Sequence, residues 1–156
     1  MFALNLPAYA CKIKTVDGKQ QIFDPLRHRY VALTPEEWVR QHFCHFLINN
    51  RHFPAGRFCQ EYRIRLNGQP RRCDTVVFDA GMKPLVIVEY KAPEVEISQA
   101  VFDQIVRYNW VLRVPWLMVS NGLSHYCCHL DYENQQVSFL PDIPFYDTLE
   151  APQGGL

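Results

Sequence analysis

Three charged residues have the types and spacing needed to bind a divalent cation and to act on a phosphate ester. Asp74 lies 15 positions before Glu89, and Lys91 follows Glu89 by two. Carboxylate oxygens suit Mg²⁺, which commonly takes one or two carboxylates, keeps several waters and contacts phosphate oxygens. A cation held there would lower the pKa of a bound water, and the lysine could orient that water or stabilise charge on phosphorus. The trio therefore predicts metal-assisted chemistry on a phosphate group.

A β-hairpin would bring these three side chains together. The turn closes if Phe78 pairs with Leu85. The same register then places Asp74 directly opposite Glu89, with Cβ atoms roughly 4.5–5.5 Å apart. Glu89 and Lys91 share a face because they are two apart on a strand. A one-residue slip would separate the acids, and a simple ion pair of Lys91 at a polar sheet edge is the alternative.

The remaining patterns predict one α/β domain around this hairpin. In chain order they indicate a β-hairpin at residues 10–24, a helix at 33–50, three strands within 57–93, a helix at 96–113 and three strands at 115–120, 123–132 and 136–141. We expect residues 1–32 to form an N-terminal hairpin extension, 33–140 to form the core, and 141–156 to be a loose tail.

Both predicted helices have recognisable signals. Thr34 can cap the first helix, Pro35 fits its first turn, and Glu37 would complete a capping box. The predicted buried stripe of the second helix consists of Ile97, Val101, Gln104, Tyr108 and Val111. Gln104 is therefore a polar group that we expect to point toward the core or its edge.

Five segments of the chain carry a resemblance to a known family. They are LTPEEWVRQHF, RRCDTVVFD, PLVIVEYKAP, DQIVRY and VPWLMVSNG, between about residues 33 and 122. In this order they resemble the N-terminal nuclease domain of type I restriction enzyme R subunits, in its small stand-alone relatives within the PD-(D/E)xK nuclease superfamily. The resemblance implies a restriction-endonuclease-like fold, an α/β fold with a central mixed β-sheet flanked by helices, to which the N-terminal β-hairpin is added. It also implies Mg²⁺- or Mn²⁺-dependent hydrolysis of DNA in a restriction or DNA-processing role.

The resemblance implies a role for each member of the trio. Asp74 and Glu89 match metal-binding acids, and the carbonyl of Tyr90 would be a further metal ligand. Lys91 matches the lysine that positions the nucleophilic water. Cys73 stands where the superfamily name has proline, which is a frequent substitution. The implied enzyme is a metal-dependent deoxyribonuclease, and the alternative is a catalytically inactive module with this fold that binds nucleic acid or a partner protein.

Three further residues are implied to support the site. Gln104 and Tyr108 match a Gln-x3-Tyr motif that lies near the active site in several branches of the superfamily. The alternative for Gln104 is an amide at the core edge that bonds to backbone. Glu37 matches an acid on the first helix that can join the metal site, and helix capping is its alternative.

Basic residues are concentrated in one part of the chain, although the formal net charge is zero. Residues 1–113 contain 16 basic and 11 acidic residues, whereas 114–156 contain five acids and no Lys or Arg. Within 51–73, six arginines accompany Glu61 alone. We expect four arginines to bind DNA phosphates, namely Arg63, Arg65, Arg71 and Arg72. The alternative is an ordinary solvated strand face.

Other features bound the remaining functions. The chain lacks a G-x4-G-K-[ST] motif, so we expect no nucleotide cofactor, and a targeting or motor protein would be a separate partner. No apolar stretch approaches the roughly 18 residues of a membrane helix. The N-terminus has no signal-peptide pattern, which indicates a cytoplasmic protein with reduced cysteines. On one strand, His125, Cys127 and His129 would share a face but span about 13 Å at the usual rise, too far for one zinc ion.

Overall fold

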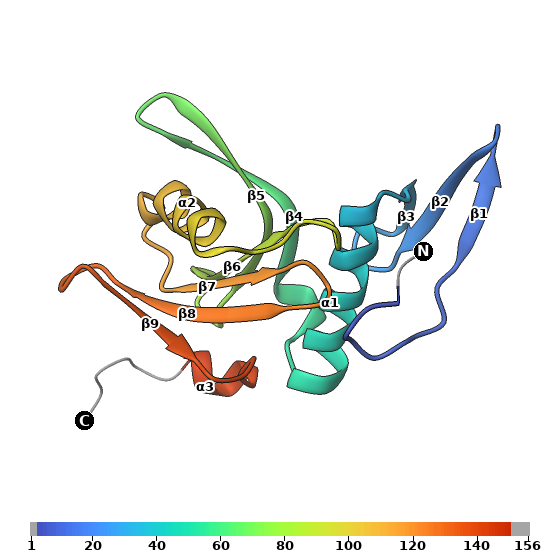
Figure 1. Cartoon of the computed structure of the whole chain (residues 1–156). Helices are drawn as coiled ribbons and strands as arrows, with labels where there is room; N and C mark the ends of the chain where they lie inside the picture. The colour runs from blue at the N-terminus through green and yellow to red at the C-terminus, as the bar shows by residue number, and fades with distance from the viewer. Residues whose placement is uncertain (1–2, 151–156) are drawn as a thin grey trace.

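A six-stranded mixed sheet is the centre of the computed structural model, which describes residues 3–150 (Figure 1). Its strands lie in the order β4-β5-β6-β7-β8-β9. They span Phe58–Leu66, Gln69–Phe78, Pro84–Tyr90, Trp116–Ser120, His125–Asp131 and Gln136–Leu140. β6 and β7 are parallel, and the other neighbouring pairs are antiparallel. The parallel pair requires a crossover connection, which contains helix α2 (Gln99–Trp110).

The N-terminal strands form a separate antiparallel sheet. These strands are β1 (Ile13–Val16), β2 (Lys19–Asp24) and β3 (Arg29–Ala32). Asp17 and Gly18 have φ angles of 51° and 75°, the left-handed conformation that a two-residue hairpin turn needs. The predicted hairpin is therefore confirmed. β3 was not predicted, because this short strand is defined by its pairing with β2 rather than by an apolar pattern of its own.

Helix α1 (Pro35–Arg51) covers one face of the central sheet. Thr34 Oγ1 accepts a hydrogen bond from the Glu37 N–H at 3.0 Å, and the helix ends at His52 with φ of 60°. The Glu37 carboxylate binds Arg27, so it does not complete the reciprocal half of the capping box. The apolar side chains on this face include Val39, Phe43 and Leu47 of α1 and Val86, Val88 and Tyr90 of β6.

Helix α2 covers the opposite face, where Phe102 and Ile105 pack with Ile87 of β6. Helices therefore lie on both faces of the mixed sheet, as predicted. The predicted buried stripe of α2 was wrong, because Gln104 and Tyr108 are exposed. A second stripe of this helix, next to the predicted one, also has helical spacing. This second stripe carries the large Phe102 ring and faces the sheet. The buried residues of α2 are Phe102, Ile105 and Asn109.

Residues 141–150 pack against the sheet, which corrects the prediction of a loose tail. Ile143 is 8% exposed, and in helix α3 (Tyr146–Glu150) Tyr146 and Leu149 are 4% and 1% exposed. The Tyr146 hydroxyl donates a hydrogen bond to the Phe78 carbonyl at 2.8 Å. The rest of the predicted tail, residues 151–156, lies outside the described part of the chain. Within residues 3–150, every helix is too short or too polar to cross a membrane.

Candidate active site

The β5–β6 hairpin has the predicted register over most of its length. Three pairs follow it, namely Thr75↔Val88, Val76↔Ile87 and Val77↔Val86. The predicted closing pair of Phe78 with Leu85 was wrong, because the register shifts after Val77. This shift lies at the turn. At the other end the ladder stops at Thr75↔Val88, so Asp74 and Glu89 follow its last pair and the predicted pair between them is not part of the ladder.

Asp74 and Glu89 meet where the ladder between β5 and β6 ends. The Asp74 carboxylate accepts a hydrogen bond from the Tyr90 N–H at 3.0 Å and also contacts the Glu89 side chain. Burial, and then the negative charge of Asp74, raise the pKa of Glu89 to about 9, although Lys91 acts in the opposite direction. Glu89 Oε1 is buried and has no hydrogen-bond partner among residues 3–150. The two acids are therefore only partly compensated by the surrounding protein.

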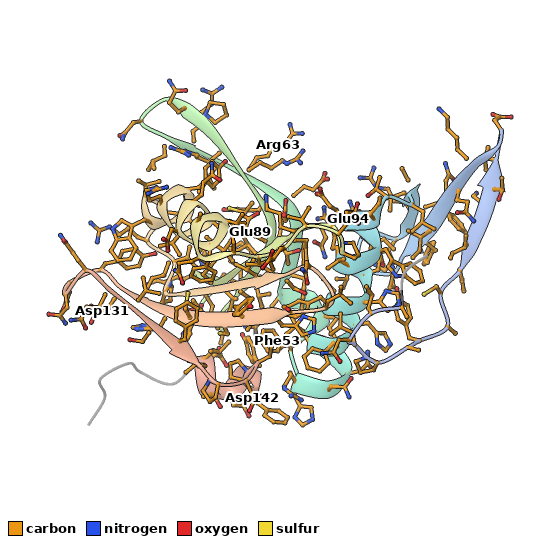
Figure 2. The ribbon with its side chains drawn as sticks, viewed as in Figure 1. Phe53, Arg63, Glu89, Glu94, Asp131 and Asp142 are labelled. Carbon is orange, nitrogen blue, oxygen red and sulfur yellow. The ribbon has the colours of Figure 1, made fainter. Side chains whose placement is uncertain are left out.

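A pocket of about 260 Å³ lies between β6 and α2 and contains several of the predicted site residues. Its lining consists of Glu89, Lys91, Gln104, Ile105, Tyr108 and Asn109. Glu89 and Lys91 reach it from one face of the strand, because side chains alternate and the intervening Tyr90 packs on the α1 face. Gln104 and Tyr108 reach it from α2, where they lie about one turn apart. Figure 2 labels Glu89 beside α2.

The side chain of Tyr90 points away from the pocket, but its backbone lies beside Asp74. The Tyr90 ring is 3% exposed, and its hydroxyl lies 2.9 Å from Thr75 Oγ1. The Tyr90 N–H donates to the Asp74 carboxylate. Because the N–H and C=O of one strand residue point to the same neighbouring strand, the Tyr90 carbonyl is directed toward the Asp74 side.

Glu37 is not among the residues that line the pocket. Its carboxylate is paired with Arg27 at 2.7 Å and with Arg40 at 3.4 Å, and it accepts a hydrogen bond from Gln41 at 2.8 Å. These contacts hold it on the α1 side of the sheet. The structure therefore separates Glu37 from the other predicted site residues.

Asn109 belongs to the pocket and was missed by the sequence reasoning. It is 1% exposed, and its Nδ2 donates a hydrogen bond to the Ile105 carbonyl at 2.9 Å. Its side chain also contacts Glu89, an interaction that favours the ionised carboxylate. The available signal was its spacing of four from Ile105, which places both residues on one helix face.

The β4–β5 hairpin carries the four predicted DNA-binding arginines and projects beyond the central sheet (Figure 1). Figure 2 labels Arg63 on this hairpin, where it pairs with Arg72 across the two strands. The Arg71 guanidinium lies 4.7 Å from the centre of the Tyr108 ring, and the Arg72 N–H donates to the Tyr108 hydroxyl at 3.4 Å. Tyr108 therefore links the hairpin to the pocket. The exposed arginines of the hairpin are Arg63, Arg65 and Arg72.

Two carboxylates are the acidic metal donors that this site offers. Within residues 3–150, no group of three or more His, Cys, Asp or Glu side chains could hold a metal ion. A cation between Asp74 and Glu89 would therefore need other ligands, such as the Tyr90 carbonyl, water and substrate oxygens. Mg²⁺ commonly accepts such a mixed set, since it retains several waters and needs few protein carboxylates.

Residues 35–144 match the family described as Type I restriction enzyme R protein N terminus (HSDR_N), which is well over half of the chain. The chain belongs to this family. A solved structure, a fragment assigned to the HsdR subunit of a type I restriction enzyme from Vibrio vulnificus YJ016, is 19% identical with a TM-score of 0.52. The similarity covers 75% of this chain and 24% of that chain, so this chain spans about a quarter of that relative's length.

The part of the chain that matches the R protein N-terminal family contains the whole candidate site. The predicted site residues from Glu37 to Tyr108 lie inside the matched range, whereas β1, β2 and β3 precede it. The likeness to the Vibrio HsdR fragment shows a shared fold. No curated protein matches the chain significantly. The candidate site therefore lies in the part of the chain that is common to this family.

Proposed function

We propose that this chain is a metal-dependent deoxyribonuclease with a restriction-endonuclease-like fold of the PD-(D/E)xK superfamily. One observation carries the proposal. The carboxylate of Asp74 contacts that of Glu89, and Glu89 lines a pocket together with Lys91. A purely structural arrangement has no need for two contacting, partly buried acids, because ionising both is unfavourable and the fold must keep Glu89 protonated.

The donor set fits a hard divalent cation. Glu89 Oε1 lacks a hydrogen-bond partner in the described chain, and burial beside Asp74 disfavours its ionised form. Asp74, Glu89 and the Tyr90 carbonyl would hold the ion. Bound Mg²⁺ or Mn²⁺ would neutralise the two acids, lower the pKa of a bound water and hold a phosphate oxygen.

The side chains of the pocket supply the remaining chemistry. In the proposed reaction a water oxygen bonds to phosphorus, the bond from phosphorus to one sugar oxygen breaks, and that oxygen takes up a proton. The Lys91 ammonium orients the water and stabilises the negative charge that develops on the phosphate oxygens. Gln104 and Tyr108 offer an amide and a hydroxyl with which to hold the water or the phosphate.

The β4–β5 hairpin supplies the surface that leads DNA to this pocket. Its exposed arginines suit the phosphate backbone, whose recognition is electrostatic and independent of sequence. Arg71 stacks on Tyr108, which also lines the pocket, so the basic surface and the pocket are continuous. Because the chain lacks a nucleotide-binding motif, a partner protein would supply targeting or translocation in a restriction-related role.

The test is cleavage of DNA by the full chain with Mg²⁺ or Mn²⁺. We expect the wild-type protein to cut, and Asp74→Asn, Glu89→Gln and Lys91→Ala each to lose about 100-fold or more in rate. Glu94→Gln and Lys83→Ala are matched controls, because both residues are exposed and lie close in the chain (Figure 2 labels Glu94). Salt-sensitive DNA retention by a wild-type protein that does not cut would instead identify a non-catalytic binding module.

A further inference from the structure

Arg40 of α1 lies behind the candidate site, among the residues that join α1 to the strands. It is 8% exposed. Its Nη1 donates hydrogen bonds to the Asp74 carbonyl at 2.8 Å and to Gln60 Oε1 at 3.2 Å. The guanidinium also lies over the Tyr90 ring, 5.6 Å from its centre. The buried Arg40 side chain thus contacts Asp74 and Tyr90, two of the proposed metal ligands.

The backbone of Asp74 needs a partner outside the sheet because the ladder is interrupted around it. The β4–β5 pairs on either side of it are Gln60↔Thr75 and Tyr62↔Cys73. Between them, Glu61 has a left-handed φ of 53°, and the two strands have no pair of Glu61 with Asp74 in the described register. On the β6 side the last pair is Thr75↔Val88. A buried carbonyl without a partner is costly, and Arg40 satisfies the one at Asp74.

A hydrogen-bonded network extends this contact to Tyr90. Gln60 Oε1, which accepts from Arg40, also accepts from Thr75 Oγ1 at 2.5 Å. Thr75 Oγ1 in turn lies 2.9 Å from the Tyr90 hydroxyl. The network therefore connects α1, β4, β5 and β6 on the α1 face of the sheet, opposite the pocket.

Two acids compensate the charge of Arg40. Glu37 Oε1 lies 3.4 Å from its Nε, and Glu61 Oε1 lies 3.8 Å from its Nη2. Arg27 shares Glu37 with it and also binds Asp24. A guanidinium that is buried and already neutralised is a poor ligand for DNA phosphates, which points to a role inside the protein.

We propose that Arg40 is a positioning residue, which fixes the backbones of Asp74 and Tyr90 so that their oxygens form a preordered cation site. This inference rests on the proposed function and identifies the residue that holds the proposed metal ligands in place. It requires arginine rather than lysine, because a planar guanidinium reaches the Asp74 carbonyl, Gln60 and the acids at once. It also gives Glu37 an indirect role, since Glu37 orients Arg40 from the same helix.

The test compares Arg40→Lys with Arg27→Lys in the full chain. Both variants keep the positive charge and both replace a guanidinium that pairs with Glu37, but only Arg40 contacts the Asp74 carbonyl. We expect Arg40→Lys to weaken Mn²⁺ binding, measured by calorimetry, about tenfold or more. It should lower kcat for DNA cleavage by a similar factor and leave the KM for DNA unchanged. Arg27→Lys should keep both values near those of the wild type, even where its Tm falls.

Each result that contradicts these expectations leads to a different conclusion. Wild-type Mn²⁺ affinity in Arg40→Lys, or equal losses in the two variants, would show that Arg40 is only a structural ion-pair residue. A wild-type protein that binds Mn²⁺ but does not cut DNA would refute the proposed function, while the comparison of Mn²⁺ affinities would still decide the role of Arg40. A wild-type protein that neither binds Mn²⁺ nor cuts DNA would refute both.

Discussion

At the scale of single residues, the protonation of Glu89 governs the candidate site. Burial and the neighbouring Asp74 raise its pKa to about 9, so the metal-free protein holds Glu89 largely protonated at neutral pH. A cation that binds at the proposed site would have to displace that proton. Cation binding should therefore strengthen as the pH rises toward the pKa of Glu89.

Glu89→Gln should stabilise the metal-free protein, and the gain should grow with pH. The folded protein holds the Glu89 proton up to about pH 9, whereas the unfolded chain releases it near 4.5, so the contribution of Glu89 to stability falls between these values. Glutamine is neutral at every pH, so the variant does not lose this stability as the pH rises. We expect the gain to grow by up to about 1.4 kcal/mol per pH unit between these values, measured as the free energy of unfolding by denaturant in the presence of a chelator.

Glu94→Gln is the matched control for this measurement, since Glu94 is an exposed acid five positions away. Its difference in unfolding free energy from the wild type should stay constant over the same pH range. If the Glu89→Gln difference were equally constant, the carboxylate would not be held in its neutral form by the fold.

The charged trio could be predicted from the sequence, whereas its neighbours on the helices could not. An aliphatic strand that ends in Glu89-x-Lys91 is a strong local pattern, and the hairpin register places Asp74 beside it. Asn109 was hidden because its burial depends on which of two stripes of α2 faces the sheet. The placement of Glu37 depends on Arg27, which lies ten residues earlier in the turn between β2 and β3 and forms a contact that no sequence pattern indicates.

At the scale of elements, the β4–β5 hairpin is the proposed DNA-binding arm. Arg63→Ala and Arg65→Ala should each weaken binding about equally for all DNA sequences and reduce the slope of log affinity against log salt by about 1. Both side chains are exposed, so unfolding free energies should change by no more than about 0.5 kcal/mol. Fluorescence anisotropy with labelled DNA over a salt series measures these slopes.

Lys19→Ala provides the control for the arm, because it removes an exposed positive charge from the β1–β2 hairpin. Its salt slope should equal that of the wild type. Arginine variants with unaltered slopes would assign the hairpin arginines to an ordinary solvated face.

The packing of α3 makes a separate prediction about stability. Leu149 is 1% exposed, so Leu149→Ala should lower the free energy of unfolding by about 2–4 kcal/mol. The exposed neighbour Thr148 offers a control, and Thr148→Ala should be close to neutral. Denaturant unfolding of both variants measures the difference, and two neutral variants would show that this segment is loose in solution.

Elements with signals of their own could be predicted, and elements defined by contacts with other segments could not. Thr34 and Asp17-Gly18 are such signals, and they mark a helix start and a hairpin turn in the structure. β3 is defined by its pairing with the neighbouring strand β2, and α3 by the burial of Tyr146 and Leu149 against the sheet. Contacts with another segment leave only weak traces in the sequence of the segment itself.

At the scale of the whole molecule, the N-terminal region is tied to the part that matches the R protein family. Arg27 bridges Asp24 of β2 and Glu37 of α1. The Asn5 N–H donates to the Gly122 carbonyl at 2.8 Å, in the turn between β7 and β8. These contacts attach the N-terminal region to α1 and to the turn between β7 and β8.

The most direct test of the proposed metal site is anomalous X-ray diffraction from crystals of the full chain soaked in Mn²⁺. We predict an anomalous peak between the carboxylates of Asp74 and Glu89, within roughly 2.1 Å of an oxygen of each, and its loss in Glu89→Gln. Well-ordered carboxylates with no peak between them, or a peak found only elsewhere in the molecule, would contradict the proposal.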